Sequence, residues 1–138
     1  MKKWLTGAAL LAAAILGVIV VGTAEAADVK FEIDAIMKKI NGGGKKSMHN
    51  DLGAALKESK IDWDEFKKKS KVYAEYGTEL AKNKEPKGDA KQWEKLSKAY
   101  SDSAKALDEA TDKKDKDAAQ KALAGTSKCK ACHDAFKG

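Results

Sequence analysis

Arginine is absent from this chain of 138 residues, and several other residue types are scarce. All 27 basic residues are lysines, and the chain holds two cysteines, two histidines and one proline. Without arginine there are no bidentate forks for phosphate groups or base edges, which argues against nucleic-acid binding. The sequence also lacks a nucleophile with its base, a paired-carboxylate site and a phosphate-binding glycine loop. We therefore expect a protein that is not an enzyme.

The first 26 residues carry the pattern of a secretory signal peptide. Two lysines precede an apolar run over 5–21, and Ala24 and Ala26 are small residues at the two positions that a signal peptidase reads. Cleavage after Ala26 leaves one domain, 27–138, in the bacterial periplasm and removes any membrane span. The apolar run is also close to spanning length, so an uncleaved membrane anchor is the alternative.

Apolar residues recur every three or four positions throughout 27–138, which predicts helices. The loop at 84–88 contains the only proline. The glycines at 42–44 either weaken the first helix or remove side chains to make room for a flat porphyrin. Four amphipathic helices with short connections favour an all-α fold, an antiparallel up-down-up-down four-helix bundle. The expected helices cover about 28–58, 62–83, 93–110 and 115–136.

The most informative motif begins nine residues before the carboxyl end. Cys129, Lys130, Ala131, Cys132 and His133 form the CxxCH pattern that attaches haem c to a polypeptide. On a helix the two cysteines and the histidine face one way, because successive residues advance by about 100°. Two thiols one turn apart can add to two vinyl groups of a porphyrin, while the imidazole binds the iron as proximal ligand. The motif predicts one covalent haem c as cofactor.

Three other interpretations of the motif are open. A thioredoxin-like redox pair requires a βαβ setting, which the helical pattern does not provide. A structural zinc site needs four ligands, and only the distant His49 could complete the set. A disulfide between Cys129 and Cys132 would leave His133 without a role.

The group at the sixth position of the iron decides the function. The candidates are Met37, Met48, His49 or no ligand at all. The first and last helices of such a bundle are antiparallel neighbours, so Met37, about 14 Å along the first helix, comes close in height to His133. Met48 and His49 would lie about 30 Å along a continuous helix. This favours Met37 as distal ligand, with a packing role as its alternative, and places His49 too far away for peroxidase acid–base chemistry.

The carboxyl end resembles the class II c-type cytochromes, the cytochrome c-prime family. The resemblance lies in the run CKACHDAFK over 129–137, where an aromatic and a basic residue follow the motif, and in Met37 followed by two lysines. It implies a periplasmic four-helix bundle. Low-spin members bind the iron through a methionine of the first helix and carry electrons. High-spin members leave the sixth position open and bind small gases.

The sequence therefore predicts a periplasmic electron-transfer cytochrome. Haem c would be attached at Cys129 and Cys132, with His133 as proximal and Met37 as distal iron ligand. The alternative is a five-coordinate, high-spin haem protein that binds NO or CO. Redox proteins are the expected partners, and lysines outnumber acidic side chains, so acidic partners would be attracted. A homodimer through exposed helix faces stays open.

Overall fold

The computed structural model describes residues 28–137, and every regular element among them is a helix. This confirms the predicted all-α class, while the predicted signal peptide, 1–26, lies outside the described residues. In the described part of the chain, no helix has the length and apolar character needed to cross a membrane. The elements in chain order are α1 (Ile33–Asn41), the 3-10 helix η1 (Gly44–Lys46), α2 (Met48–Ala55), α3 (Trp63–Leu80), α4 (Ala90–Asp112), α5 (Lys116–Gly125) and α6 (Cys129–Phe136).

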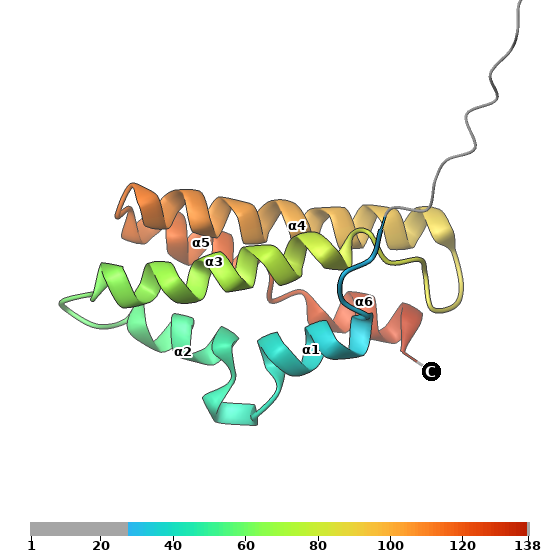
Figure 1. Cartoon of the computed structure of the whole chain (residues 1–138), viewed down its shortest axis with the longest axis horizontal. Coiled ribbons are helices and arrows are strands. Elements are labelled where there is room, and N and C mark those ends of the chain that lie inside the picture. The colour runs from blue at the N-terminus through green and yellow to red at the C-terminus, as the bar shows by residue number, and fades with distance from the viewer. Residues whose placement is uncertain (1–27, 138) are drawn as a thin grey trace, which may run out of the picture.

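The long helices α3 and α4 pack antiparallel along the length of the molecule (Figure 1). Helices α1 and α2 pack against α3, and α5 packs against α4. The chain direction reverses from α2 to α3, again from α3 to α4, and once more from α4 to α5 and α6. Side chains from all six α-helices form one buried core. Its larger members are Ile36, Ile40, Leu52, Leu56, Phe66, Tyr73, Leu80, Trp93, Leu107, Leu123 and Phe136.

An aspartate caps the amino end of each of the helices α3, α4 and α5. The carboxylates of Asp62, Asp89 and Asp115 each accept a hydrogen bond from a backbone N–H in the first turn of α3, α4 and α5. Such N-caps satisfy amide groups that have no partner within the helix. The predicted helices 62–83 and 93–110 agree with the bounds of α3 and α4 to within three residues.

The first predicted helix is broken, so the prediction of one helix over 28–58 is wrong. α1 ends at Asn41 and α2 begins at Met48. Between them Gly43 and Gly44 have φ angles of 91° and 58°, which glycine adopts readily and which a right-handed helix excludes. Ser47 then caps α2 by accepting a hydrogen bond from the Asn50 N–H at 3.2 Å. The glycines therefore end α1, and α2 begins as a separate helix.

The last predicted helix, 115–136, is also broken. α5 ends at Gly125 and α6 begins at Cys129. Between them, the hydroxyls of Thr126 and Ser127 donate to the Leu123 carbonyl at 2.7 and 3.2 Å. Glycine followed by two hydroxyl residues is a poor helix former, because such side chains bond to the backbone and compete with the helical ladder. The chain therefore leaves α5 in a new direction before the CxxCH segment.

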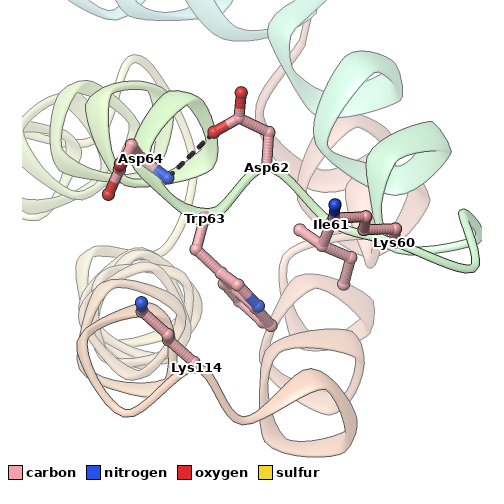
Figure 2. Close-up of a pocket in the computed structure, with 6 residues that line it drawn as sticks. All are labelled: Lys60, Ile61, Asp62, Trp63, Asp64 and Lys114. Atoms are coloured by element: carbon pink, nitrogen blue, oxygen red, sulfur yellow. Dashed lines mark hydrogen bonds between the residues drawn. The ribbon is translucent and has the colours of Figure 1, made fainter.

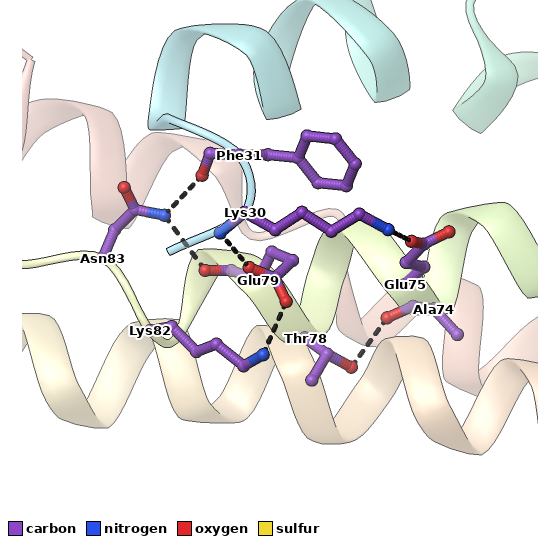
Figure 3. Close-up of polar contacts among 8 residues, drawn as sticks. All are labelled: Lys30, Phe31, Ala74, Glu75, Thr78, Glu79, Lys82 and Asn83. Atoms are coloured by element: carbon purple, nitrogen blue, oxygen red, sulfur yellow. Dashed lines mark hydrogen bonds and ion pairs between the residues drawn. The ribbon is translucent and has the colours of Figure 1, made fainter. Parts of the chain in front are cut away.

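The segment before α1 is tied to the carboxyl end of α3 (Figure 3). The backbone N–H of Lys30 donates to the Glu79 carboxylate at 2.9 Å, and the side-chain amide of Asn83 donates to the Phe31 carbonyl at 3.0 Å. The Phe31 ring stacks on Tyr76 with 4.3 Å between the ring centroids. These contacts fix the start of α1 on α3.

Two helical glycines provide a matched test of the packing between helices. A methyl group added at Gly77 would lie 2.6 Å from the Ala104 Cβ of α4, whereas at Gly53 the nearest atom, on Leu123, would lie 3.7 Å away. Alanine favours an isolated helix by ~1 kcal/mol at either position, but overpacking costs ~1–3 kcal/mol. We expect Gly77→Ala to lower the free energy of unfolding in urea and Gly53→Ala to raise it. Equal effects of the two would contradict the close approach of α3 and α4.

Candidate functional site

The CxxCH segment forms the start of α6. Cys129 is exposed, Cys132 is half-buried against the core, and His133 is exposed. Because the segment is helical, both sulfurs and the imidazole lie within an arc of about 100° around the helix axis. Both cysteines are free thiols, so the structure does not support the disulfide interpretation.

Phe136 fixes α6 on the long helix α4. Its side chain is 5% exposed, and its ring meets the Trp93 indole edge-on with 5.2 Å between the centroids. Trp93 in turn donates its indole N–H to the Asn83 carbonyl at 2.7 Å. The anchor holds α6 at its carboxyl end and leaves Cys129 and His133 accessible at the surface.

The other two interpretations of the motif are not supported either. Residues 28–137 contain no strand, so the βαβ setting of a redox pair is missing. Burial, with a further contribution from Cys129, raises the pKa of the Cys132 thiol, whereas reactive CxxC pairs have a lowered pKa. Over the same range, no three His, Cys, Asp or Glu side chains are placed together to hold a metal ion, and His49 does not complete a zinc site.

The donor set of α6 fits a covalently attached haem. Two free thiols stand one helical turn apart, and the histidine follows the second of them directly. This is the spacing at which two thioether bonds and one axial imidazole can serve a single porphyrin. The residues that would hold the group are Cys129, Cys132 and His133.

Met37, the predicted distal ligand, is half-buried on α1 and packs against the core. Its sulfur accepts a weak hydrogen bond from the Asn41 side chain at 3.7 Å. Figure 1 shows α1 and α6 at the same end of the molecule and on the same side of the α3–α4 pair. α1, which carries Met37, packs on α3, whereas α6, which carries His133, packs on α4, and no extensive packing of α1 on α6 is seen among residues 28–137.

Two surface cavities contain no residue of the motif. The larger, about 370 Å³, is lined by Trp63, Lys114 and their neighbours where α3 begins (Figure 2). The smaller, about 220 Å³, lies beside the α1–α2 connection and is lined by Lys39, Lys46 and Lys69 among others. The start of α3 and the helix α6 lie toward opposite ends of the molecule, so the larger cavity does not belong to the candidate site.

His49 lies beside the CxxCH segment, so the prediction that it is remote is wrong. Its Nε2 is 3.2 Å from the Ser127 hydroxyl, and Ser127 precedes Cys129 by two residues. The remote position assumed a continuous first helix, whereas the break at the glycines lets α2 pack against both α3 and α5. The three consecutive glycines were the one sequence signal that could have indicated this.

His49 belongs to a chain of polar side chains that we name the hydroxyl network. Its members are His49, Tyr73, Tyr100, Thr126 and Ser127. The fully buried Tyr73 hydroxyl donates to Thr126 at 2.8 Å, accepts from Tyr100 at 3.1 Å and lies 2.9 Å from His49 Nδ1. Burial raises the pKa of both tyrosines and lowers the pKa of His49. The network therefore holds protonated phenols and favours a neutral imidazole.

No protein-family model matches the chain, and neither a curated protein nor a solved structure is similar enough to count as a relative. The assignment of function consequently depends on the residues of the chain and on their arrangement.

Proposed function

We propose that the protein is a periplasmic electron-transfer cytochrome that carries one covalent haem c. The observation that carries this proposal is the CxxCH segment on α6, with both thiols free and its histidine accessible. The spacing is specific to covalent haem attachment, and the disulfide, redox-pair and zinc alternatives are not supported by the surroundings of the motif.

Each residue of the site has a distinct role in this proposal. Cys129 and Cys132 hold the porphyrin through thioether bonds, which keeps it in place in every oxidation state. With haem bound, the imidazole of His133 would bind the iron, and the soft thioether of Met37 would favour the ferrous state. The haem supplies the electron chemistry by cycling between ferric and ferrous iron. The chain converts no substrate and holds the cofactor for exchange with partner proteins.

The same proposal describes the fold as a four-helix bundle of the class II cytochrome kind. α1 and α2 together form a broken first helix, and α5 and α6 together form a broken last helix. The long helices α3 and α4 lie between them in chain order. In such a bundle the first and last helices are neighbours, which is the relation that ligation by Met37 and His133 would require. The packing of α2 against α5 supports this arrangement.

The location and the partners follow from composition. The signal-like segment, 1–26, directs the domain to the periplasm. The excess of lysine over acidic side chains attracts acidic redox proteins over long distances, and this attraction weakens as salt is added.

Covalent attachment is tested by expression together with a cytochrome maturation system. We expect the purified protein to keep its colour after denaturation, because the porphyrin is bonded to both sulfurs. Cys129→Ala and Cys132→Ala should each leave one thioether bond, which shifts the absorption bands of the denatured protein. Lys130→Ala is the matched control within the motif and should behave as wild type. A colourless wild-type protein with two free thiols would contradict the proposal.

Replacement of Met37 tests the sixth iron ligand. We expect wild-type ferrous protein to be low-spin, and we expect Met37→Ala to become high-spin and to bind CO without displacing a ligand. Met48→Ala is the control, because Met48 is also a partly buried methionine that packs on the core. High-spin wild-type protein with an unchanged spectrum in Met37→Ala would instead indicate the five-coordinate, gas-binding protein.

A further inference from the structure

His49 is a titratable group beside the haem-attachment segment that the proposed iron ligation does not use. It is half-buried at the start of α2, and both of its ring nitrogens have partners: the Tyr73 hydroxyl at Nδ1 and the Ser127 hydroxyl at Nε2. Histidine is the side chain whose ordinary pKa lies closest to physiological pH, so a small change in its surroundings can change its charge.

The partners of Tyr73 determine which nitrogen of His49 carries a proton. Tyr73 has one hydroxyl proton and donates it to Thr126, so its oxygen accepts from Tyr100 and from His49. Nδ1 is therefore the donor, and Nε2 of the neutral ring is left to accept the hydrogen bond from Ser127. A second proton on His49 would bind at Nε2.

The network can accept that second proton without losing a hydrogen bond. Ser127 is within reach of two acceptors, because its hydroxyl lies 3.2 Å from His49 Nε2 and 3.2 Å from the Leu123 carbonyl. When Nε2 is protonated, it donates to the Ser127 oxygen, and the Ser127 hydroxyl proton turns to Leu123. Both charge states of His49 are thus fully hydrogen-bonded, which is what a reversible proton site requires.

The proton site lies close to the point of haem attachment. Ser127 and Cys129 are two residues apart, and two residues of chain span at most about 7 Å. The Cys129 thiol also folds back and donates to the Thr126 carbonyl at 3.9 Å. His49 is half-buried, and a charge on a partly buried group is screened by salt less than a charge on an exposed group.

Neighbouring charges have little influence on the pKa of His49. α5 presents Leu123 and Thr126 to the network, and neither titrates. Lys46 and Asp51 flank His49 in the sequence, Lys69 lies one turn before Tyr73 on α3, Tyr100 belongs to the hydroxyl network, and Lys128 and Cys129 follow Ser127. None of these groups contributes to the shift in the pKa of His49, which burial alone lowers. Asp51 and Lys69 form an ion pair at 3.7 Å, and burial keeps both tyrosines protonated.

We propose that His49 takes up a proton when the haem is reduced, so that the protein carries a proton together with its electron. This inference rests on the proposed function. With haem bound, one electron from a redox partner would reduce the iron, and one proton from water would bind Nε2 of His49, where an N–H bond forms. On reoxidation the electron would pass to the next partner and the proton would return to water.

The sign of the effect follows from linkage. A positive charge on His49 stabilises the extra electron, so protonation raises the reduction potential, and reduction raises the pKa of His49 by the equivalent amount. Because burial lowers that pKa from its ordinary value of about 6.5, the potential should be constant at alkaline pH. It should rise as the pH falls through the neutral and mildly acidic range.

The experiment measures the reduction potential of the haem-loaded protein from about pH 5 to 9. We expect the potential of the wild type to fall as the pH rises over part of this range, with about 59 mV per pH unit, the value for one proton per electron, as the upper limit of the slope. His49→Gln keeps polar atoms near the two partners but does not titrate, so this part of the slope should disappear. Asp51→Asn is the matched control on the same helix, and its slope should persist. An unchanged slope in His49→Gln would overturn the proposal, since any titration of the haem itself is common to both proteins.

A second measurement does not depend on a folded variant. The His49 ring signals in the NMR spectrum of the wild type, titrated in the ferric and ferrous states, should give a higher pKa in the ferrous state. Equal pKa values would overturn the coupling while leaving the electron carrier intact. A protein without covalent haem would overturn the proposed function itself, which its lack of colour reveals separately.

Discussion

The hydrogen bond from Tyr73 to Thr126 fixes the junction from which the candidate site projects. Tyr73 is fully buried on the long helix α3, and Thr126, 2% exposed, directly follows α5. A buried hydroxyl left without a partner costs ~1–3 kcal/mol, so the two side chains hold each other in place. Cys129 begins α6 only three residues later. The packed α3–α4 pair thereby sets where the CxxCH segment starts, and the contact of Phe136 with Trp93 of α4 holds its end.

The two helix breaks serve this same arrangement. At Gly43 and Gly44 the chain turns, so that α2 reaches both α3 and α5 and brings His49 to Ser127. At 126–128 the chain leaves α5, so that Phe136 can pack on Trp93. On a continuous first helix His49 would stand about 18 Å beyond Met37. The breaks therefore bring the polar side chains of His49 and Ser127 together beside the motif.

Periodicity predicted the helical class and the two long helices, because the stripes of α3 and α4 begin at aspartate caps and run without interruption. It did not predict the breaks. The apolar stripe of the first segment keeps its phase across the glycines, so the pattern alone cannot distinguish a bent path from a straight one. The CxxCH residues were found from spacing. The contact between His49 and Ser127 joins residues 78 positions apart and depends on both breaks, so no local pattern encodes it.

A covalent bond between α6 and a porphyrin is the central requirement of the proposed function. The most direct test is the mass of the intact, denatured protein after expression with a cytochrome maturation system. We predict a single species that is heavier than the polypeptide by one haem, with no free thiol left at Cys129 or Cys132. A mass equal to that of the polypeptide, with both thiols open to alkylation, would contradict the account.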